Sequence, residues 1–414
     1  VYGYDARLPN MLYAAIARPS TLNGKILRAT PGDASQQSGV VSVVANEEFA
    51  GVAAESRAQA QAALTALDIE WDAGETFQQA DIETLTTVGE GNGVVIQKEG
   101  DAVGELRDDS GIIIGEYRTP VAAHAHLEPQ SVLVDVQPEV VSVYVYTQAP
   151  YMVRSSVAEA LGRDEEEINV LPVYLGGGLG SKVGTESAAQ AALLSQEAGR
   201  PVHLGWTRNE DLRYGYFRPP THHVLRAKVD ETGRMQVMDH QQASGDVAFP
   251  FLPPFLPAVM GADFGAWRGA TIPYDIPHRQ TVAWRIKLPF PTGWWRGLGL
   301  LANVYALESF VDEVAHATGT DPLEFRLQQL PVGELGARMR VVLERAAEAA
   351  NWGGSLPAGH AQDHRHVHLV VEQRVAVVVV AVVAEALAVI GDERDDRPVP
   401  LVRVVQRSQH HADA

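Results

Sequence analysis

The 414 residues include no cysteine. This absence excludes disulfides, thiolate zinc sites, a cysteine nucleophile and any thiolate-bound iron–sulfur cluster from this chain. Basic residues are few, with 33 lysines and arginines against 52 aspartates and glutamates and a formal net charge of −19. So much negative charge disfavours duplex nucleic acid and anionic membranes as partners. The hydrophobic fraction of 46% and the length allow two or three globular domains with their own cores.

Apolar runs of membrane-spanning length are also lacking. The most apolar run, residues 375–390, is short for a transmembrane helix and includes Glu385. The first residues have no basic segment followed by an apolar one, so no signal peptide is visible. We therefore expect no membrane insertion by this chain, and either a cytoplasmic or a periplasmic location stays open.

The order of predicted elements indicates an α+β protein. Residues 1–76 contain short β-type runs at 11–17 and 40–44 and a helix near 53–67. Residues 77–109 are polar and rich in turn residues, so we interpret them as a connector. From residue 110 onward, strands and helices alternate again to about residue 357, which predicts a second and larger α+β domain.

Within this second part the patterns place the elements as follows. Strands are predicted at 111–117, 132–136, 140–147 and 168–174, and a hairpin at 222–229 and 235–242. Helices are predicted at 151–161, 186–198, 304–317 and 336–352. The proline- and phenylalanine-rich residues 249–257 predict a loop that forms one wall of a substrate funnel.

The composition changes in residues 358–414, which form an atypical tail. From 359 onward the tail has no Phe, Tyr or Trp and holds six of the fourteen histidines. His360, His364, His366 and His368 could bind a metal, but no acidic or thiolate partner follows at a fixed spacing. We favour no metal site there, and consider an altered reading frame or an unusual extension as origins of the tail.

A glycine-rich segment, LGGGLG at residues 175–180, follows the apolar run 168–174. Glycine lets a backbone approach a ligand closely and leaves its N–H groups free to face an anion. The segment lacks the GK[ST] ending of a P-loop and the spacing of a dinucleotide-binding fold, which argues against an ordinary nucleotide-binding ligase or transferase. Taken alone, the segment is also compatible with a surface turn.

Several motifs follow one another along the chain: residues 4–12, 18–19, 115–118 (GEYR), 124–129 (HAHLEP), 146–150 (YTQAP), 175–180, 206–210 (WTRNE), 274–277 (YDIP) and 295–330. Together they resemble the molybdenum-binding subunit of the xanthine dehydrogenase and aldehyde oxidase family of molybdenum hydroxylases. The resemblance extends to about residue 357 and is nearest to bacterial dehydrogenases of aldehydes, nicotinate and isoquinoline. It implies an N-terminal α/β hammerhead-like module at 1–76, followed by the first half of a molybdopterin-binding α+β domain at 110–357.

The resemblance also implies a reaction and its cofactors. An aldehyde or an N-heterocycle would be hydroxylated with oxygen from water at molybdenum held by molybdopterin, in its cytosine dinucleotide form, with no direct protein ligand to the metal. Because this chain has no cysteine, the [2Fe–2S] clusters are expected in a separate small subunit. A FAD subunit or a cytochrome c subunit is a further candidate partner.

The family's site residues carry over onto specific positions of this chain. Gln148 matches an amide that hydrogen-bonds an oxo ligand, and Arg296 matches a guanidinium that forks to cofactor or substrate oxygens. Without the resemblance, Gln148 would be interpreted as a turn cap and Arg296 as half of a surface ion pair; we favour the functional interpretation of both. The expected cofactor-binding residues are Gly176, Gly177, Gly178, Leu179, Gly180, Gly297, Leu298 and Gly299.

His124 and Glu128 lie four residues apart, a spacing that also suits a metal site or an acid–base pair. The resemblance instead makes Glu128 and Pro129 part of a structural turn, with His124 buried beneath the site. We prefer this structural interpretation.

The chain departs from the family at positions that matter for chemistry. Leu179 and Leu298 stand where relatives carry aromatic residues, and Val183 where some carry a carboxylate, so xanthine is an unfavourable substrate. The family's general base, a glutamate in a Gly-Glu motif, has no match, because Glu372 and Glu385 stand in other contexts. The alternative hypothesis is therefore a scaffold of the same fold that is catalytically incompetent.

Overall fold

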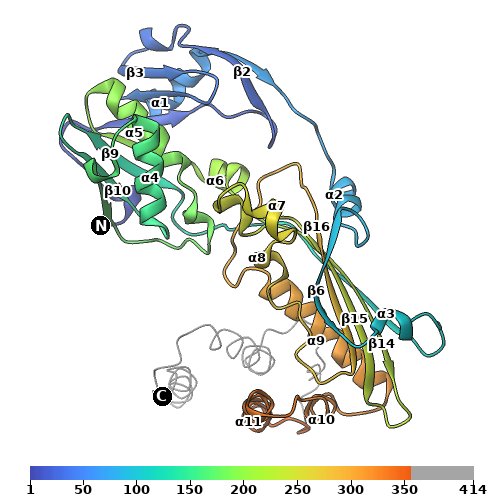
Figure 1. Ribbon diagram of the computed structural model, residues 1–414. Helices are drawn as coiled ribbons and strands as arrows, with labels where there is room; N and C mark the ends of the chain where they lie inside the picture. The colour runs from blue at the N-terminus through green and yellow to red at the C-terminus, as the bar shows by residue number, and fades with distance from the viewer. Residues whose placement is uncertain (356–414) are drawn as a thin grey trace. The chain divides into compact units, whose positions relative to one another are not determined.

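Helices and strands alternate along the chain in the computed structural model, which describes residues 1–355 (Figure 1). The chain divides into two units, Val1–Pro322 and Leu323–Ala414. The strands are β1 (Leu12–Ile16), β2 (Lys25–Thr30), β3 (Val40–Ala45), β4 (Ala50–Ala54), β5 (Asp68–Asp72), β6 (Asn92–Glu99), β7 (Ile113–Thr119), β8 (Ala122–Ala123), β9 (Ser131–Val136), β10 (Val141–Val145), β11 (Ile168–Pro172), β12 (Val202–Gly205), β13 (Phe217–Arg218), β14 (Thr221–Val229), β15 (Met235–Ser244) and β16 (His278–Arg285).

The helices differ in length from one turn to five. Two short 3₁₀ turns, η5 (Ser181–Val183) and η6 (Phe249–Phe251), lie in loops that matter below. The α-helices are α1 (Arg57–Ala63), α2 (Gln79–Leu85), α3 (Ala102–Glu105), α4 (Pro150–Leu161), α5 (Glu186–Ala198), α6 (Arg208–Tyr214), α7 (Leu256–Met260), α8 (Phe264–Trp267), α9 (Leu300–Ala317), α10 (Pro322–Gln328) and α11 (Glu334–Ala349).

A seven-stranded mixed sheet joins the N-terminal strands to strands from residues 131–205. Its order is β11-β10-β9-β12-β1-β4-β3, and Leu12 of β1 pairs in parallel with Val202 of β12. Apolar side chains of β9 and β10 pack against α4 and α5 in one core, which includes Val134, Val143, Val157 and Leu194. The N-terminal residues therefore complete this sheet.

Proline and glycine residues set the ends of α4 and α5, the two helices of this core. Pro150 occupies the first turn of α4, where a missing N–H costs no helical hydrogen bond. Gly162 and Gly199 end α4 and α5 in the left-handed conformation that glycine adopts without strain. The predicted helix 186–198 is confirmed as α5.

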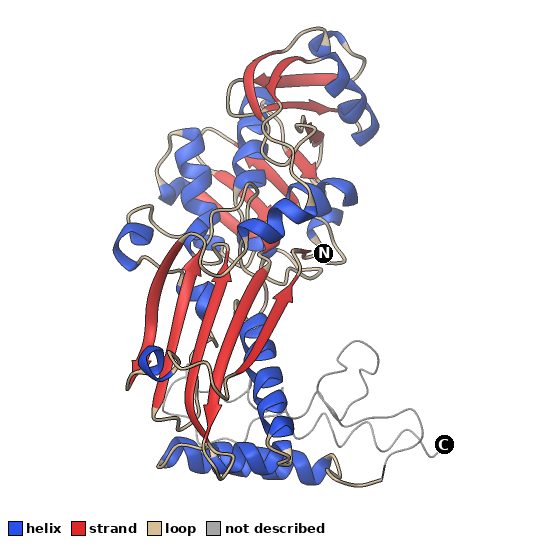
Figure 2. Cartoon of the chain, turned by 90° about the vertical axis from the view of Figure 1, so that its right-hand side faces the viewer, coloured by secondary structure: helices blue, strands red, loops and turns tan. Residues whose placement is uncertain are grey.

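A second sheet of five strands has the order β6-β16-β15-β14-β7. Figure 2 shows these strands side by side, with α9 along the sheet, and α9 packs against β7 and β14. The predicted hairpin is confirmed: the Asp230 carboxylate accepts the N–H groups of Thr232 and Arg234 and so closes the turn between β14 and β15.

Three expectations are corrected by the structure. The presumed connector 77–109 contains α2, β6 and α3; β6 is an edge strand whose partner, β16, lies far away in sequence. The presumed helix 53–67 begins only at Arg57, because Ala53 and Ala54 end β4 and Ser56 caps the helix by accepting the N–H of Gln59. The presumed loop 249–257 starts with η6 and runs into α7.

The described residues of the second unit form α10 and α11, and Arg340 of α11 donates to the carbonyl of Leu327. The predicted helix 336–352 corresponds to α11. Among residues 1–355 no helix is both long and apolar enough to cross a membrane. The expectations for Glu372, Glu385 and the tail histidines lie outside the described residues, and the boundaries at 76, 109 and 357 stay predictions.

Candidate functional site

The glycine loop, defined as Gly176–Gly180, connects β11 to η5 and α5, as the sequence predicts. Its backbone is left-handed at Gly177 (φ 87°), Leu179 (φ 56°) and Gly180 (φ 110°). Within residues 1–355, the N–H groups of Gly177, Gly178 and Leu179 have no hydrogen-bond acceptor. Successive unpaired N–H groups in such a backbone form a concave donor set for an anionic or oxo group.

Gln148 lies beside this loop and is bonded to it. Its side-chain Oε1 accepts the N–H of Gly180 at 3.0 Å, and its own N–H donates to the Lys182 carbonyl at 2.9 Å. A Cβ on Gly178 would come within 2.6 Å of the same Oε1, so a larger residue there would displace the Gln148 side chain from the loop. The amide oxygen is thus used as a loop cap, while the exposed side chain retains its NH₂ group as a free donor.

The arginine turn, defined as residues 295–299, reaches the glycine loop from the other side. The Arg296 N–H donates to the Leu179 carbonyl at 2.8 Å, and a Cβ on Gly180 would lie only 2.1 Å from the Trp294 carbonyl oxygen. In the described part of the chain the exposed Arg296 guanidinium forms no ion pair. The Gln148 side chain and the Arg296 backbone therefore both bond to the glycine loop.

Backbone strain is concentrated at these loops. Of the five non-glycine residues with positive φ in the described residues, Ala125, Leu179 and Leu298 lie in or beside the site. Each costs about 1–2 kcal/mol relative to a right-handed conformation. Strain of this kind persists where the surrounding structure imposes it, which occurs most often at binding and catalytic sites. The two leucines stand at the positions where aromatic residues are expected from the resemblance.

His124 supports the arginine turn from beneath. Its ring stacks on Trp295 with centroids 4.8 Å apart, Nε2 lies 2.5 Å from the Trp294 carbonyl oxygen, and Nδ1 lies 3.0 Å from that of Tyr216. Burial lowers the pKa of His124, so we assign the single N–H of the neutral ring to the shorter contact. Both ring nitrogens thus face backbone carbonyl oxygens, which favours the structural interpretation of His124.

Glu128 ties the N-terminal segment to the glycine loop. Its two carboxylate oxygens accept the N–H groups of Tyr4 and Gly176, each at 2.8 Å. Hydrogen bonds from N–H groups to a carboxylate are stronger than those between neutral groups. Glu128 is therefore occupied in holding two backbone segments, as expected of a structural residue.

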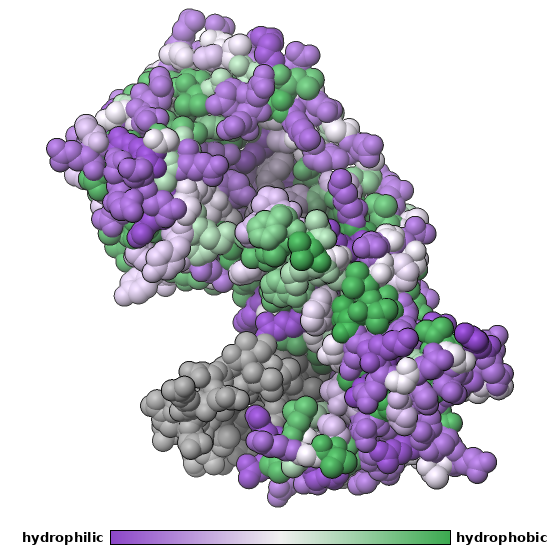
Figure 3. All heavy atoms as spheres, viewed as in Figure 1, coloured by the Kyte–Doolittle hydropathy of each residue, from purple (hydrophilic) through white to green (hydrophobic). Residues whose placement is uncertain are grey.

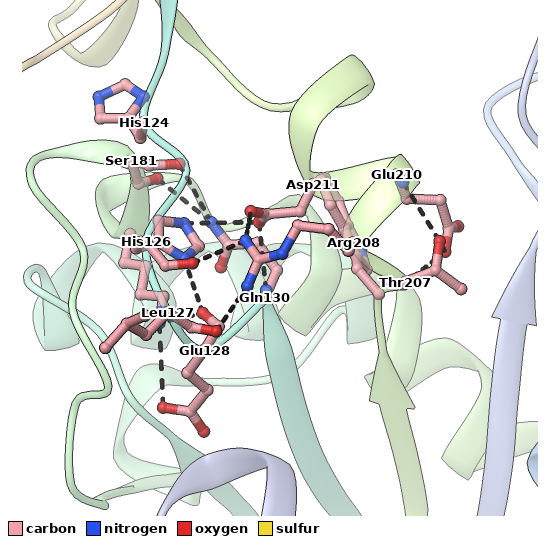
Figure 4. A network of polar contacts seen from close by, with 12 residues as sticks. His124, His126, Leu127, Glu128, Gln130, Ser181, Thr207, Arg208, Glu210 and Asp211 are labelled. Carbon is pink, nitrogen blue, oxygen red and sulfur yellow. Dashed lines mark hydrogen bonds and ion pairs between the residues drawn. The ribbon is translucent and has the colours of Figure 1, made fainter.

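A charged network lies beside the glycine loop, and Figure 4 labels its members His126, Glu128, Arg208 and Asp211. Lys182 donates to the Glu128 carbonyl at 2.8 Å and lies 3.5 Å from the centre of the Tyr146 ring. Arg208 donates to the carbonyls of His126 and Leu127. Two cations thus take up three consecutive carbonyls, which fixes the path of residues 126–128 beside the glycine loop.

Burial alters the proton affinities in this network. It lowers the pKa of His126 to about 4, with a further contribution from Lys182, and raises the pKa of Asp211. His126 Nδ1 donates to the Glu128 carbonyl at 2.6 Å, which leaves Nε2 as an acceptor 3.4 Å from Asp211 Oδ1. Asp211 also accepts the N–H of Gln130 through Oδ1 and pairs with Arg208 through Oδ2 at 3.0 Å, which ties His126 to both neighbours. Nothing in the sequence near Asp211 predicts this pair, and the two histidines of the HAHLEP motif do not identify Asp211 as a neighbour.

The burial of Lys182 predicts that the stability of the chain depends on pH. Burial lowers its pKa from 10.5 to about 7, so between these values the unfolded chain binds more protons than the folded one and stability rises with pH. From pH 7 to pH 9 we expect wild type to gain about 2 kcal/mol of unfolding free energy relative to Lys182→Met, measured by urea unfolding. Lys287→Met, at an exposed lysine, should leave this gain unchanged. A Lys182→Met chain with the wild-type pH dependence would contradict the expectation.

Comparisons with known proteins identify the family of the chain. The family described as "Molybdopterin cofactor-binding domain" matches residues 88–330. A nicotinate dehydrogenase subunit of Pseudomonas putida is 26% identical over 366 residues, covering 85% of this chain and 30% of the relative. The membrane-bound aldehyde dehydrogenase [pyrroloquinoline-quinone] of Gluconacetobacter polyoxogenes is 28% identical, covering 86% and 50%. The beta subunit of isoquinoline 1-oxidoreductase of Brevundimonas diminuta is 27% identical, covering 90% and 50%.

A solved structure shares the fold. Aldehyde oxidoreductase from Desulfovibrio gigas superposes with a TM-score of 0.70 at 17% identity, covering 86% of this chain and 46% of that chain. The chain spans between about a third and a half of the length of these relatives. With the family matching more than half of its residues, the chain belongs to the molybdopterin cofactor-binding proteins of the xanthine dehydrogenase family.

Proposed function

We propose that this chain is a molybdenum-cofactor-binding part of an oxidoreductase that hydroxylates an aldehyde or an N-heterocycle with oxygen from water. The observation that carries the proposal is the meeting of three unpaired N–H groups of the glycine loop with Gln148 and the arginine turn. These groups are donors without acceptors, which suits a ligand made of oxo, thiolate and phosphate groups. The residues present therefore fit a molybdopterin.

Each residue has a defined role in this proposal. The free NH₂ of Gln148 donates to an oxygen without adding charge. The Arg296 guanidinium, which has no ion-pair partner among the described residues, forks to cofactor or substrate oxygens. The backbone of the glycine loop and of Gly297, Leu298 and Gly299 would hold the pterin. When bound, the cofactor supplies the two-electron redox and oxygen-transfer chemistry.

The nucleotide end of the cofactor is the finer part of the proposal. We propose the cytosine dinucleotide form, on the resemblance to bacterial dehydrogenases. The N-terminus of α5 is a poor place for its phosphates, because Glu186 already puts a carboxylate there and accepts the Tyr216 hydroxyl at 2.6 Å. The glycine loop is the better candidate.

We propose that electrons leave through iron–sulfur clusters that lie outside these 414 residues. With no cysteine in these residues, they cannot hold thiolate-bound [2Fe–2S] clusters themselves. We propose an iron–sulfur small subunit, with a FAD or a cytochrome c subunit as the next carrier. The nicotinate and isoquinoline relatives are each named as one subunit of their enzyme, which supports an assembly of several chains.

The surface beside the site favours an apolar substrate. Phe251 of η6 packs on Trp294 and Tyr216, with ring centroids 5.3 and 4.8 Å apart. The segment continues into α7, where Phe255, Val259 and Met260 are exposed, and Figure 3 shows apolar side chains gathered on this face. With Leu298 in place of an aromatic residue, we propose aliphatic or heteroaromatic substrates without a purine ring.

Metal analysis tests the proposal. The chain is purified in its native assembly, and molybdenum, pterin and quinone cofactors are quantified. We expect about one molybdenum and one pterin per chain, because the donor set is preformed. Assemblies without molybdenum would contradict the proposal and favour a scaffold of the same fold. A quinone in place of the pterin would point to the cofactor that the name of the Gluconacetobacter relative carries.

A further inference from the structure

Asp263 is a buried carboxylate that gathers two backbone segments. Only 3% of the residue is exposed, and within the described residues no lysine or arginine forms an ion pair with it. Its charge is instead balanced by five backbone donors, a number that stabilises an ionised carboxylate in the interior. The donors are the N–H groups of Val247, Ala248 and Phe249 to Oδ2, each at 2.8 Å, and of Gly265 and Ala266 to Oδ1, at 2.7 and 3.2 Å.

One of these segments bonds directly to the arginine turn. The Gly265 carbonyl accepts the N–H of Gly299 at 2.8 Å, and the Ala266 carbonyl accepts the side-chain amide of Asn303 at 2.8 Å. Contact is so close that a Cβ on Gly299 would lie 2.2 Å from the Ala266 oxygen. A shift of Gly265 and Ala266 would therefore move the turn.

The other segment contacts the residue that precedes the turn. Phe249 begins η6, and Phe251 at its end packs edge-on against Trp294 at 5.3 Å. The Trp294 carbonyl oxygen accepts a hydrogen bond from His124 Nε2 and packs closely against Gly180 of the glycine loop. Asp263 thus reaches the arginine turn from both ends, although it lies about thirty residues before the turn in sequence.

We propose that Asp263 is a positioning residue that fixes the arginine turn against the glycine loop. One carboxylate holds residues 247–249 and 265–266 together, and these segments set the positions of Trp294 and Gly299. Its significance for cofactor or substrate binding rests on the proposed function, because that is what makes the arginine turn part of the site. Asp263 acts only through these two backbone segments, because its carboxylate bonds to their N–H groups.

Asp263→Asn tests the proposal by removing acceptors while keeping the shape. An amide has one accepting oxygen, so its NH₂ group must face either the donors of 247–249 or those of 265–266. We expect amide hydrogen exchange in residues 294–300 to become about tenfold faster or more, measured by mass spectrometry on the cofactor-free chain. In the assembled enzyme, Asp263→Asn should raise KM or lower the amount of retained cofactor. These changes should be larger than those of a control variant with the same loss of melting temperature.

Asp239→Asn is the matched control. Asp239 is a fully buried carboxylate of β15 that pairs with Arg226 at 2.7 Å, so its loss should destabilise the chain without accelerating exchange at 294–300. Equal acceleration in both variants would overturn the proposal. If Asp263→Asn does not fold, Asp263→Ser, which keeps one acceptor oxygen, is compared with Asp239→Ser. A wild-type assembly without molybdenum would contradict the proposed function, while the exchange result would still decide the role of Asp263.

Discussion

Gly180→Ala is expected to lose about 3–5 kcal/mol of unfolding free energy and, with it, the bound cofactor. The new Cβ would lie 2.1 Å from the Trp294 carbonyl oxygen, a backbone atom that cannot rotate away. At φ 110° the backbone is also one that alanine rarely adopts. Relief requires the glycine loop to separate from the arginine turn, which breaks the hydrogen bond from Arg296 to Leu179. Urea unfolding and molybdenum content measure the two effects.

Gly177→Ala is the matched control, because Gly177 has a similarly left-handed φ of 87° but more room. Its nearest neighbour would be the Cβ of His126 at 3.3 Å. The strain alone should cost about 1–2 kcal/mol, and the contact with the arginine turn should survive. If both variants lost the same stability and cofactor, contact with Trp294 would not be what requires Gly180.

Gln148→Ala is expected to reduce turnover about 10- to 100-fold per bound molybdenum, the effect of losing one hydrogen bond of about 1–3 kcal/mol. The free NH₂ of Gln148 is the group proposed to donate to a ligand oxygen, while its Oε1 caps the glycine loop through Gly180. The loop keeps its other support from Glu128, so cofactor content should fall less than turnover. Dye reduction with an aldehyde or nicotinate by the assembled enzyme gives the rate.

Gln148→Glu separates the two roles of this side chain. A carboxylate still accepts the Gly180 N–H but has no proton to donate at neutral pH, so turnover per molybdenum should be as low as in Gln148→Ala. Gln130→Ala is a control for a nearby amide, because Gln130 bonds inward to Ser181 and should leave turnover per molybdenum near wild type. Wild-type turnover in Gln148→Glu would make Gln148 a loop cap alone.

Local features of the sequence account for much of the fold. The helix 186–198, the hairpin around Asp230 and the glycine loop all follow from short-range rules: periodicity, a turn-forming aspartate and residues that tolerate positive φ. That Gln148 and Arg296 both lie against the glycine loop was predictable only through the resemblance, because 148 residues separate them. The prediction was wrong for β6, because the polar composition of residues 77–109 indicates a connector. The strand forms there because it pairs with β16, which is distant in sequence.

By itself, the sequence determined the class of the protein, the absence of thiolate chemistry and the loop in which glycines leave N–H groups unpaired. Tertiary structure alone decided which side chains support that loop. Lys182, His126, Asp211 and Asp263 have no local signature, because each is an ordinary polar residue until folding buries it. Their roles come from backbone carbonyls and N–H groups brought from other elements, and burial then changes their pKa values or fixes their hydrogen bonds. Such long-range burial is not encoded in any short segment of the chain.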